Sequence, residues 1–123
     1  MAGDVGEGMN HKTGIIETDE QTFVLDDDGH LADPNTWTRA FAEQLASNDG
    51  RVLSEDQWWL IEWVRDYWRS YGNAPLMRSV VVAYRAYKQD PSLGSASIYD
   101  LFTDNPVREA CRLGGVPKPD WCI

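Results

Sequence analysis

The sequence lacks any long apolar run, since no stretch approaches the roughly 20 consecutive apolar residues that cross a bilayer. It also lacks a basic start followed by an apolar segment, so we expect neither a membrane span nor a secretory signal. Two cysteines and two histidines are the only soft metal ligands, and their positions do not match zinc-site spacing. Glycine motifs for phosphate or dinucleotide binding are missing as well. We therefore expect no metal, no cofactor and a cytoplasmic location, where thiols stay reduced.

Positive charge is also scarce, with 11 lysines and arginines against 20 acidic residues and a net charge of −9. Residues 1–34 hold nine acidic residues and one lysine, whereas residues 35–123 hold eleven acidic and ten basic residues. The acidity therefore belongs to the N-terminal segment. A net charge of this sign disfavours nucleic acid and anionic lipid as partners.

The chain has enough apolar material for one packed domain, with 42% hydrophobic residues and six tryptophans in 123 residues. Residues 1–13 are glycine-rich and polar, which predicts a disordered tail. Residues 15–17 and 22–25 are short β-prone runs, and the Asp-Asp-Asp-Gly turn at residues 26–29 follows them. This pattern predicts a small hairpin that needs helices to pack on.

Helical periodicity dominates from residue 33 onward. We expect about five helices, over residues 34–48, 54–71, 75–88, 97–102 and 106–113. The second is the clearest, because Ser54 and Gln57 form a capping box and Gly72 can end it. Its stripe from Leu60 to Tyr71 includes tryptophans that we assign to the core. The prediction is a mainly α fold with an N-terminal hairpin and an orthogonal, winged-helix-like bundle.

The last ten residues form a different kind of segment. Gly114 and Gly115 can end the final helix and act as a hinge, while Pro117 and Pro119 stiffen the chain on either side of Lys118. We therefore divide the chain into a tail (1–13), a helical domain (14–113) and a mobile C-terminal arm (114–123).

Both cysteines lie in the last thirteen residues. Cys111 falls on a predicted helix, where a buried inert thiol is the more common interpretation. Cys122 is next to the last residue, and such a position is rarely buried, which favours a reactive thiol. The arm can project Cys122 into a partner or fold back so that the two sulfurs bond.

This tail resembles that of the DsrC/TusE family of sulfur carriers, which ends in Cys-x₅-Pro-Lys-Pro-x-x-Cys-x. Further segments match the family in order and spacing, at residues 28–31, 53–58, 61–67, 74–78 and 99–102. The resemblance covers about residues 14–123. The sequence differs from the family before the last cysteine, where Asp120 and Trp121 replace the usual Thr-Gly.

The resemblance implies that Cys122 carries sulfur as a persulfide and that Cys111, as in DsrC-type members, joins it in disulfide and trisulfide states. It further implies a monomeric carrier that is not itself an enzyme. The implied partners are the siroheme enzyme dissimilatory sulfite reductase, sulfurtransferases of DsrEFH or TusA type, and a membrane-bound or heterodisulfide-reductase-like reductant.

Four cations are candidate substrate-binding residues around these thiols, namely Arg78, Arg108, Arg112 and Lys118. They could hold the folded arm or stabilise a persulfide anion. The alternative is that they are ordinary surface cations paired with some of the many acids.

Two other functions stay open at this point. The first is a TusE-like relay for tRNA 2-thiouridine synthesis, which would need Cys122 alone. The second is a DNA-binding regulator, in which helical cations contact phosphates. The cations in question are Arg65, Arg69, Arg78, Arg85 and Lys88. Acidic residues alternate with them, and the net charge is unfavourable for this function.

Overall fold

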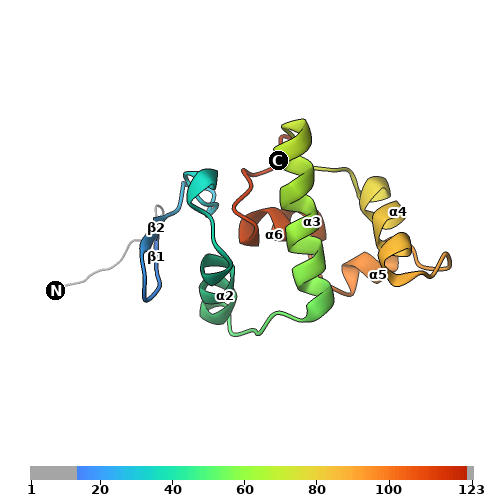
Figure 1. The fold of residues 1–123 in the computed structure, drawn as a ribbon, viewed down its shortest axis with the longest axis horizontal. Helices are drawn as coiled ribbons and strands as arrows, with labels where there is room; N and C mark the ends of the chain where they lie inside the picture. The colour runs from blue at the N-terminus through green and yellow to red at the C-terminus, as the bar shows by residue number, and fades with distance from the viewer. Residues whose placement is uncertain (1–13, 122–123) are drawn as a thin grey trace.

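The computed structural model describes residues 14–121 (Figure 1). The expected tail at residues 1–13 and the thiol of Cys122 lie outside the described residues. The elements in chain order are β1 (Ile15–Glu17), β2 (Thr22–Val24), the 3-10 helix η2 (Pro34–Thr36), α2 (Arg39–Asn48), α3 (Glu55–Tyr71), α4 (Met77–Lys88), α5 (Ser95–Tyr99) and α6 (Pro106–Leu113). The mainly helical class with an N-terminal hairpin is confirmed.

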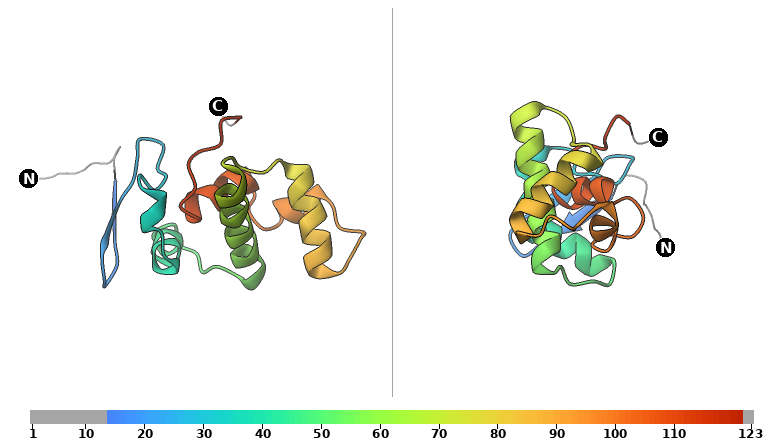
Figure 2. Two further views of the ribbon diagram at one scale, coloured as in Figure 1. Left: turned by 45° about the horizontal axis from the view of Figure 1, so that its top comes forward. Right: turned by 90° about the vertical axis from the view of Figure 1, so that its right-hand side faces the viewer.

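The hairpin lies at one end of the molecule, beside α2 (Figure 2). Strands β1 and β2 pair antiparallel, with Ile16 opposite Phe23. Both of these side chains are buried while their neighbours are exposed, as the alternation of a half-buried strand requires. The Phe23 ring lies 5.1 Å from that of Phe41 on α2. The hairpin therefore obtains its stability from a helix, as expected for two short strands.

The single helix expected over residues 34–48 is wrong, because the structure breaks it in two. Trp37 has an extended backbone (φ −57°, ψ 139°) between η2 and α2. Thr38 then caps α2, and its side chain accepts the N–H of Phe41. A second N-cap residue thus starts a new helix, and the break places the Trp37 indole against the C-terminal end of α6.

Helix α3 begins and ends as predicted. Ser54 and Gln57 form the capping box, and Gly72 ends the helix with a left-handed backbone (φ 80°). The predicted stripe is only partly right, however. The fully buried positions are Leu60, Ile61 and Val64, where α3 packs on α6, whereas Tyr71 is 67% exposed.

The tryptophans of α3 pack on the edge of the core instead of filling it. Trp59, Trp63, Tyr67 and Tyr71 are spaced four residues apart and form a row of ring contacts, with centroid distances of 6.0, 5.5 and 4.6 Å. The i, i+4 spacing places these rings one above another on a single side of the helix.

The remaining helices follow the predicted order with shifted ends. Leu76 precedes α4, which therefore starts two residues later than expected, and α5 covers residues 95–99 instead of 97–102. The predicted start of α6 is confirmed, with Asn105 as the N-cap and Pro106 in the first turn. Helices α4 and α5 lie on the far side of α3 from the hairpin (Figure 2). Within residues 14–121, no helix has the length and apolarity needed to span a membrane.

Candidate functional site

Cys111 lies in the last turns of α6 and is completely buried. Helix α6 starts where the Asn105 side chain accepts the N–H of Arg108 at 3.2 Å. The apolar side of the helix then turns Val107, Ala110 and Cys111 toward α2 and α3. The helical position predicted for this cysteine is confirmed, and its sulfur chemistry stays a prediction.

The chain reverses just after α6 in a Schellman motif. The Val116 N–H donates to the carbonyl of Cys111 at 2.9 Å, and Gly115 between them has φ 69°. A side chain at Gly115 would lie 2.6 Å from Cδ1 of Trp37, so only glycine fits there. The motif ties the start of the arm to the backbone of Cys111.

Three side chains from distant elements bind the carbonyls that follow Cys111, in an arrangement that we call the carbonyl clasp. Trp37 Nε1 donates to Leu113 O at 2.8 Å, Arg65 donates to Gly114 O at 3.0 Å, and His30 Nδ1 lies 2.9 Å from Val116 O. The last carbonyls of a helix lack partners within the helix, and the clasp supplies them.

None of the three clasp contacts is predicted from the sequence, and His30 is the member with the most unusual environment. It is completely buried, and its Nε2 has no hydrogen-bond partner. Burial lowers the pKa of His30, against the opposing effect of its bond to Val116 and of the nearby Asp26. The neutral ring therefore carries its proton on Nδ1, where the Val116 carbonyl accepts it.

The arm beyond Val116 lies along the ends of α3 and α4. Gly114, Gly115 and Val116 are buried, so the part of the predicted arm that lies on the surface begins at Pro117. Residues 117–121 line one side of a groove of about 860 Å³, and Tyr67, Trp68 and the segment leading into α4 line the other.

Two of the four candidate cations line this groove. Arg78, from the first turn of α4, and Lys118, from the arm, both line it. Lys118 also lies 3.7 Å from the Asp28 carboxylate, so the turn at residues 26–31 contacts the arm at a second point besides His30. The groove therefore borders the end of the arm with two cations, Arg78 and Lys118, and one acid, Asp120.

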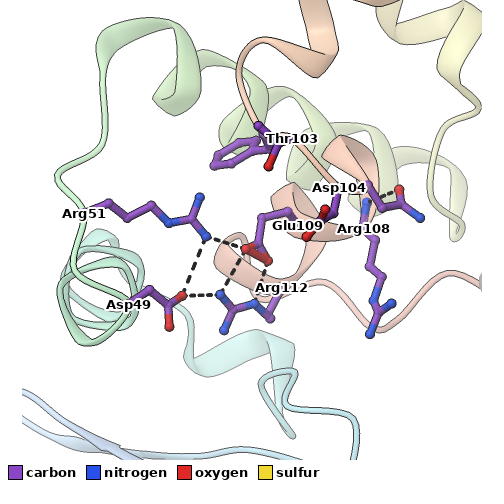
Figure 3. A pocket seen from close by; sticks show the side chains of 9 residues that line it. Asp49, Arg51, Thr103, Asp104, Arg108, Glu109 and Arg112 are labelled. Atoms are coloured by element: carbon purple, nitrogen blue, oxygen red, sulfur yellow. Dashed lines mark hydrogen bonds and ion pairs between the residues drawn. The ribbon is translucent and has the colours of Figure 1, made fainter.

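The other two candidate cations line a separate pocket of about 530 Å³ beside α6 (Figure 3). Arg112 pairs with Glu109 and Asp49, and Arg51 pairs with the same two carboxylates. Burial alone would lower the pKa of Arg112, but these bonds hold it above its ordinary value. Arg112 therefore binds acids of its own chain.

Arg108 extends away from this cluster of ion pairs (Figure 3). Its charge, like that of Arg112, acts on His30 and lowers the pKa of that ring. The sequence predicts all four cations around the thiols, whereas the structure divides them between the groove and this pocket. Within residues 14–121, no cluster of three or more His, Cys, Asp or Glu side chains is placed to hold a metal.

Several of the cations named for the DNA-binding alternative make contacts within the chain. Arg65 is half-buried and bonds to two backbone carbonyls, those of Gly114 and Pro34. Arg85 donates to Leu93 O, and Lys88 pairs with Asp56. These three side chains therefore make contacts within the chain.

Known proteins are similar to this chain in both sequence and fold. The family profile described as "DsrC like protein" matches residues 17–123. A protein of Pectobacterium atrosepticum named sulfurtransferase TusE is 30% identical over 109 residues, which cover 89% of this chain and all of that protein.

Two solved structures agree with this match. The solution structure of DsrC from Allochromatium vinosum superposes with a TM-score of 0.78 at 32% identity, covering 90% of this chain and 99% of that one. The oxidised gamma-subunit of dissimilatory sulfite reductase (DsrC) from Archaeoglobus fulgidus gives a TM-score of 0.75 at 33% identity, covering 89% of this chain and all of that one.

Proposed function

The chain belongs to the DsrC family, and from that premise we propose that it is a sulfur carrier that holds sulfane sulfur on Cys122 and uses Cys111 as a second thiol. The observation that carries the proposal is the placement of Cys111. The thiol lies in the helix from which the arm departs, and the arm is tied to its backbone through Val116. A second cysteine fixed at the root of a mobile arm suits an exchange between two sulfur atoms.

Loading requires no net oxidation. The Cys122 thiolate attacks the outer sulfur of a donor persulfide, a new S–S bond forms on Cys122, and the donor leaves as a thiol. Arg78 lies beside the arm and Lys118 lies within it, and their positive charge favours a thiolate or persulfide anion, while Asp120 in the same groove opposes it.

Unloading uses Cys111. Its thiolate attacks Sγ of Cys122 and displaces the carried sulfur as hydrosulfide, so that each cysteine is oxidised by one electron and the sulfane sulfur is reduced. A disulfide between Cys111 and Cys122 remains, and an external reductant of membrane-bound or heterodisulfide-reductase-like type returns the two electrons. The trisulfide state requires sulfur in a more oxidised form, which sulfite reductase would supply.

The proposed partners follow from the same premise. The Archaeoglobus relative is called a gamma-subunit of dissimilatory sulfite reductase, which supports that enzyme as the first partner. Sulfurtransferases of DsrEFH or TusA type are the proposed donors. We place the chain in the cytoplasm as a monomer that has no turnover of its own and acts as the co-substrate of these enzymes.

The test is to load the reduced protein with a persulfidated sulfurtransferase and weigh it intact. We expect an added mass of one sulfur in the wild type and in Cys111→Ser, and none in Cys122→Ser. Cys111→Ser should also lack the intramolecular disulfide after unloading. An adduct that persists in Cys122→Ser would contradict the assignment of the carrier thiol.

A TusE-like relay is the second candidate, favoured by the relatives that bear this name. In such a relay Cys122 passes its sulfur onward without Cys111. Sulfur delivery to a tRNA-thiolating partner would then proceed at the wild-type rate in Cys111→Ser. The carrier with two thiols instead predicts that this substitution removes the disulfide and trisulfide states.

A further inference from the structure

Cys111 cannot react where the structure places it, because its side chain is completely buried. Helices α2 and α3 pack against α6, which carries this residue. The short segment of residues 114–116 folds back beside Cys111, since the Val116 N–H donates to the Cys111 carbonyl, and Val116 is also completely buried. In Schellman motifs an apolar contact frequently joins the residue in the position of Val116 to the residue in the position of Cys111 or to the one before it. This segment belongs to no helix or strand, so it can lift without moving one.

The carbonyl clasp is what fastens this segment. Trp37 and Arg65 bind Leu113 and Gly114, at the end of α6, whereas His30 binds Val116 itself. His30 therefore holds the outermost residue of this segment. The segment is also pressed closely on α3, since a side chain at Gly114 would lie 3.2 Å from the carbonyl oxygen of Ile61.

His30 makes one side-chain hydrogen bond and leaves its second ring nitrogen buried without a partner. Such a group adds little to the stability of a core, since the desolvation of the unpartnered nitrogen offsets the bond that is made. The one hydrogen bond that the buried ring makes instead fixes the position of Val116.

We propose that the carbonyl clasp is a gate over Cys111 and that His30 is the positioning residue that keeps it closed. When the bond from Nδ1 to the Val116 carbonyl breaks, residues 114–116 lift and the Cys111 sulfur becomes accessible. Release of the arm and exposure of the second thiol are then one event, so Cys111 enters the reaction only when the arm has moved. The use of this gate in sulfur transfer rests on the proposed function. The control of Cys111 accessibility by the carbonyl clasp does not.

The experiment measures the reaction of Cys111 with 4,4′-dithiodipyridine under native conditions, in a Cys122→Ser background that leaves a single thiol. His30→Phe keeps a ring but loses the donor, and we expect it to react about five to ten times faster, as the loss of one net hydrogen bond implies. His30→Asn retains a donor at the position of Nδ1 and should react within about twofold of the parent.

Val80→Ala is the matched control, because it opens a cavity in the core under α4 and does not touch the clasp. It should lower the free energy of unfolding without accelerating the reaction of Cys111. Trp37→Phe, which removes another donor of the clasp, should accelerate it and serves if His30→Phe does not fold. The gate is overturned if His30→Phe and Trp37→Phe leave the rate unchanged. It is also overturned if Val80→Ala accelerates equally, or if His30→Asn reacts as fast as His30→Phe. Failure of Cys122 to accept sulfur would not alter any of these rates.

Discussion

Nδ1 of His30 lies 2.9 Å from the carbonyl oxygen of Val116, and this contact joins the turn after β2 to the chain that leaves α6. The two residues are 86 positions apart. The same turn contacts the arm again through Asp28 and Lys118. An element that looks peripheral in sequence, the N-terminal hairpin and its turn, therefore helps to determine where the C-terminal arm begins.

His30 should make the stability of the protein depend on pH in a defined interval. Burial lowers the pKa of its ring in the folded state, and the charges of Arg108 and Arg112 add to this effect, while the bond to Val116 and the charge of Asp26 oppose it. As pH falls below about 6.5, the His30 side chain becomes protonated in the unfolded chain while it is still neutral in the folded protein. The free energy of unfolding should therefore fall as pH drops from about 6.5 toward the folded pKa, by at most about 1.4 kcal/mol per pH unit.

Urea unfolding at about pH 7.5, 6.5 and 5.5 measures this slope. His30→Phe removes the titrating ring and should show a flatter profile across the same interval. Parallel profiles for the two proteins would show that the ring does not titrate in the folded state as its burial requires.

Gly115→Ala should destabilise the fold more than the same change at another glycine of similar backbone. Gly115 combines φ 69° with a close approach to Trp37, whereas Gly50 has φ 80° and open space around it. An alanine at either position costs about 1–2 kcal/mol for the left-handed backbone. Overpacking against Trp37 adds about 1–3 kcal/mol at Gly115 alone. Equal urea midpoints for Gly115→Ala and Gly50→Ala would contradict the steric argument.

Much of the fold could be predicted because its signals are local. The capping box of α3, the N-cap of α6 and the two short strands each depend on residues within a few positions of one another. The expected helix over residues 34–48 was wrong because periodicity alone does not reveal that Thr38 starts a second helix. The two thiols and their order along the chain were evident from the sequence, and their chemistry still depends on the family resemblance.

The carbonyl clasp could not be predicted, for a physical reason. Its acceptors are backbone carbonyls, which every residue has, and its donors are 49 to 86 positions away from them. The division of the four cations was equally hidden, since it depends on how α4, α6 and the arm meet in space. The one available signal was a histidine following a tight turn, and histidine is intermediate in burial, so its residue type does not indicate a buried position.

The ion pairs beside α6 should contribute stability that disappears in acid. Burial would raise the pKa of Glu109, but Arg112 and Arg51 hold it below its ordinary value. Its contribution is therefore complete above about pH 4.3 and is lost as pH falls further. Glu109→Gln should cost about 1–3 kcal/mol at neutral pH, because it leaves Arg112 half-buried with one acid fewer. Glu43→Gln, on the exposed side of α2, should change the free energy of unfolding by less than about 0.5 kcal/mol. Equal losses in the two variants would contradict a specific role for the pair.

The positive charge of Arg78 should accelerate the reaction of the Cys122 thiol with anionic reagents more than its reaction with neutral ones. Arg78 lines the groove together with Lys118 and Trp121. Because Trp121 directly precedes Cys122, the charge of Arg78 lies near the end of the described arm. In a Cys111→Ser background, Arg78→Gln should slow the reaction with the dianionic disulfide DTNB about two- to fivefold, as expected for one charge near solvent. The rate with neutral 4,4′-dithiodipyridine should change less, and about 0.5 M salt should abolish the difference. Arg69→Gln, outside the groove, is the control and should leave both rates unchanged. If Arg78→Gln and Arg69→Gln slow DTNB equally, net charge is the cause and the groove has no local effect.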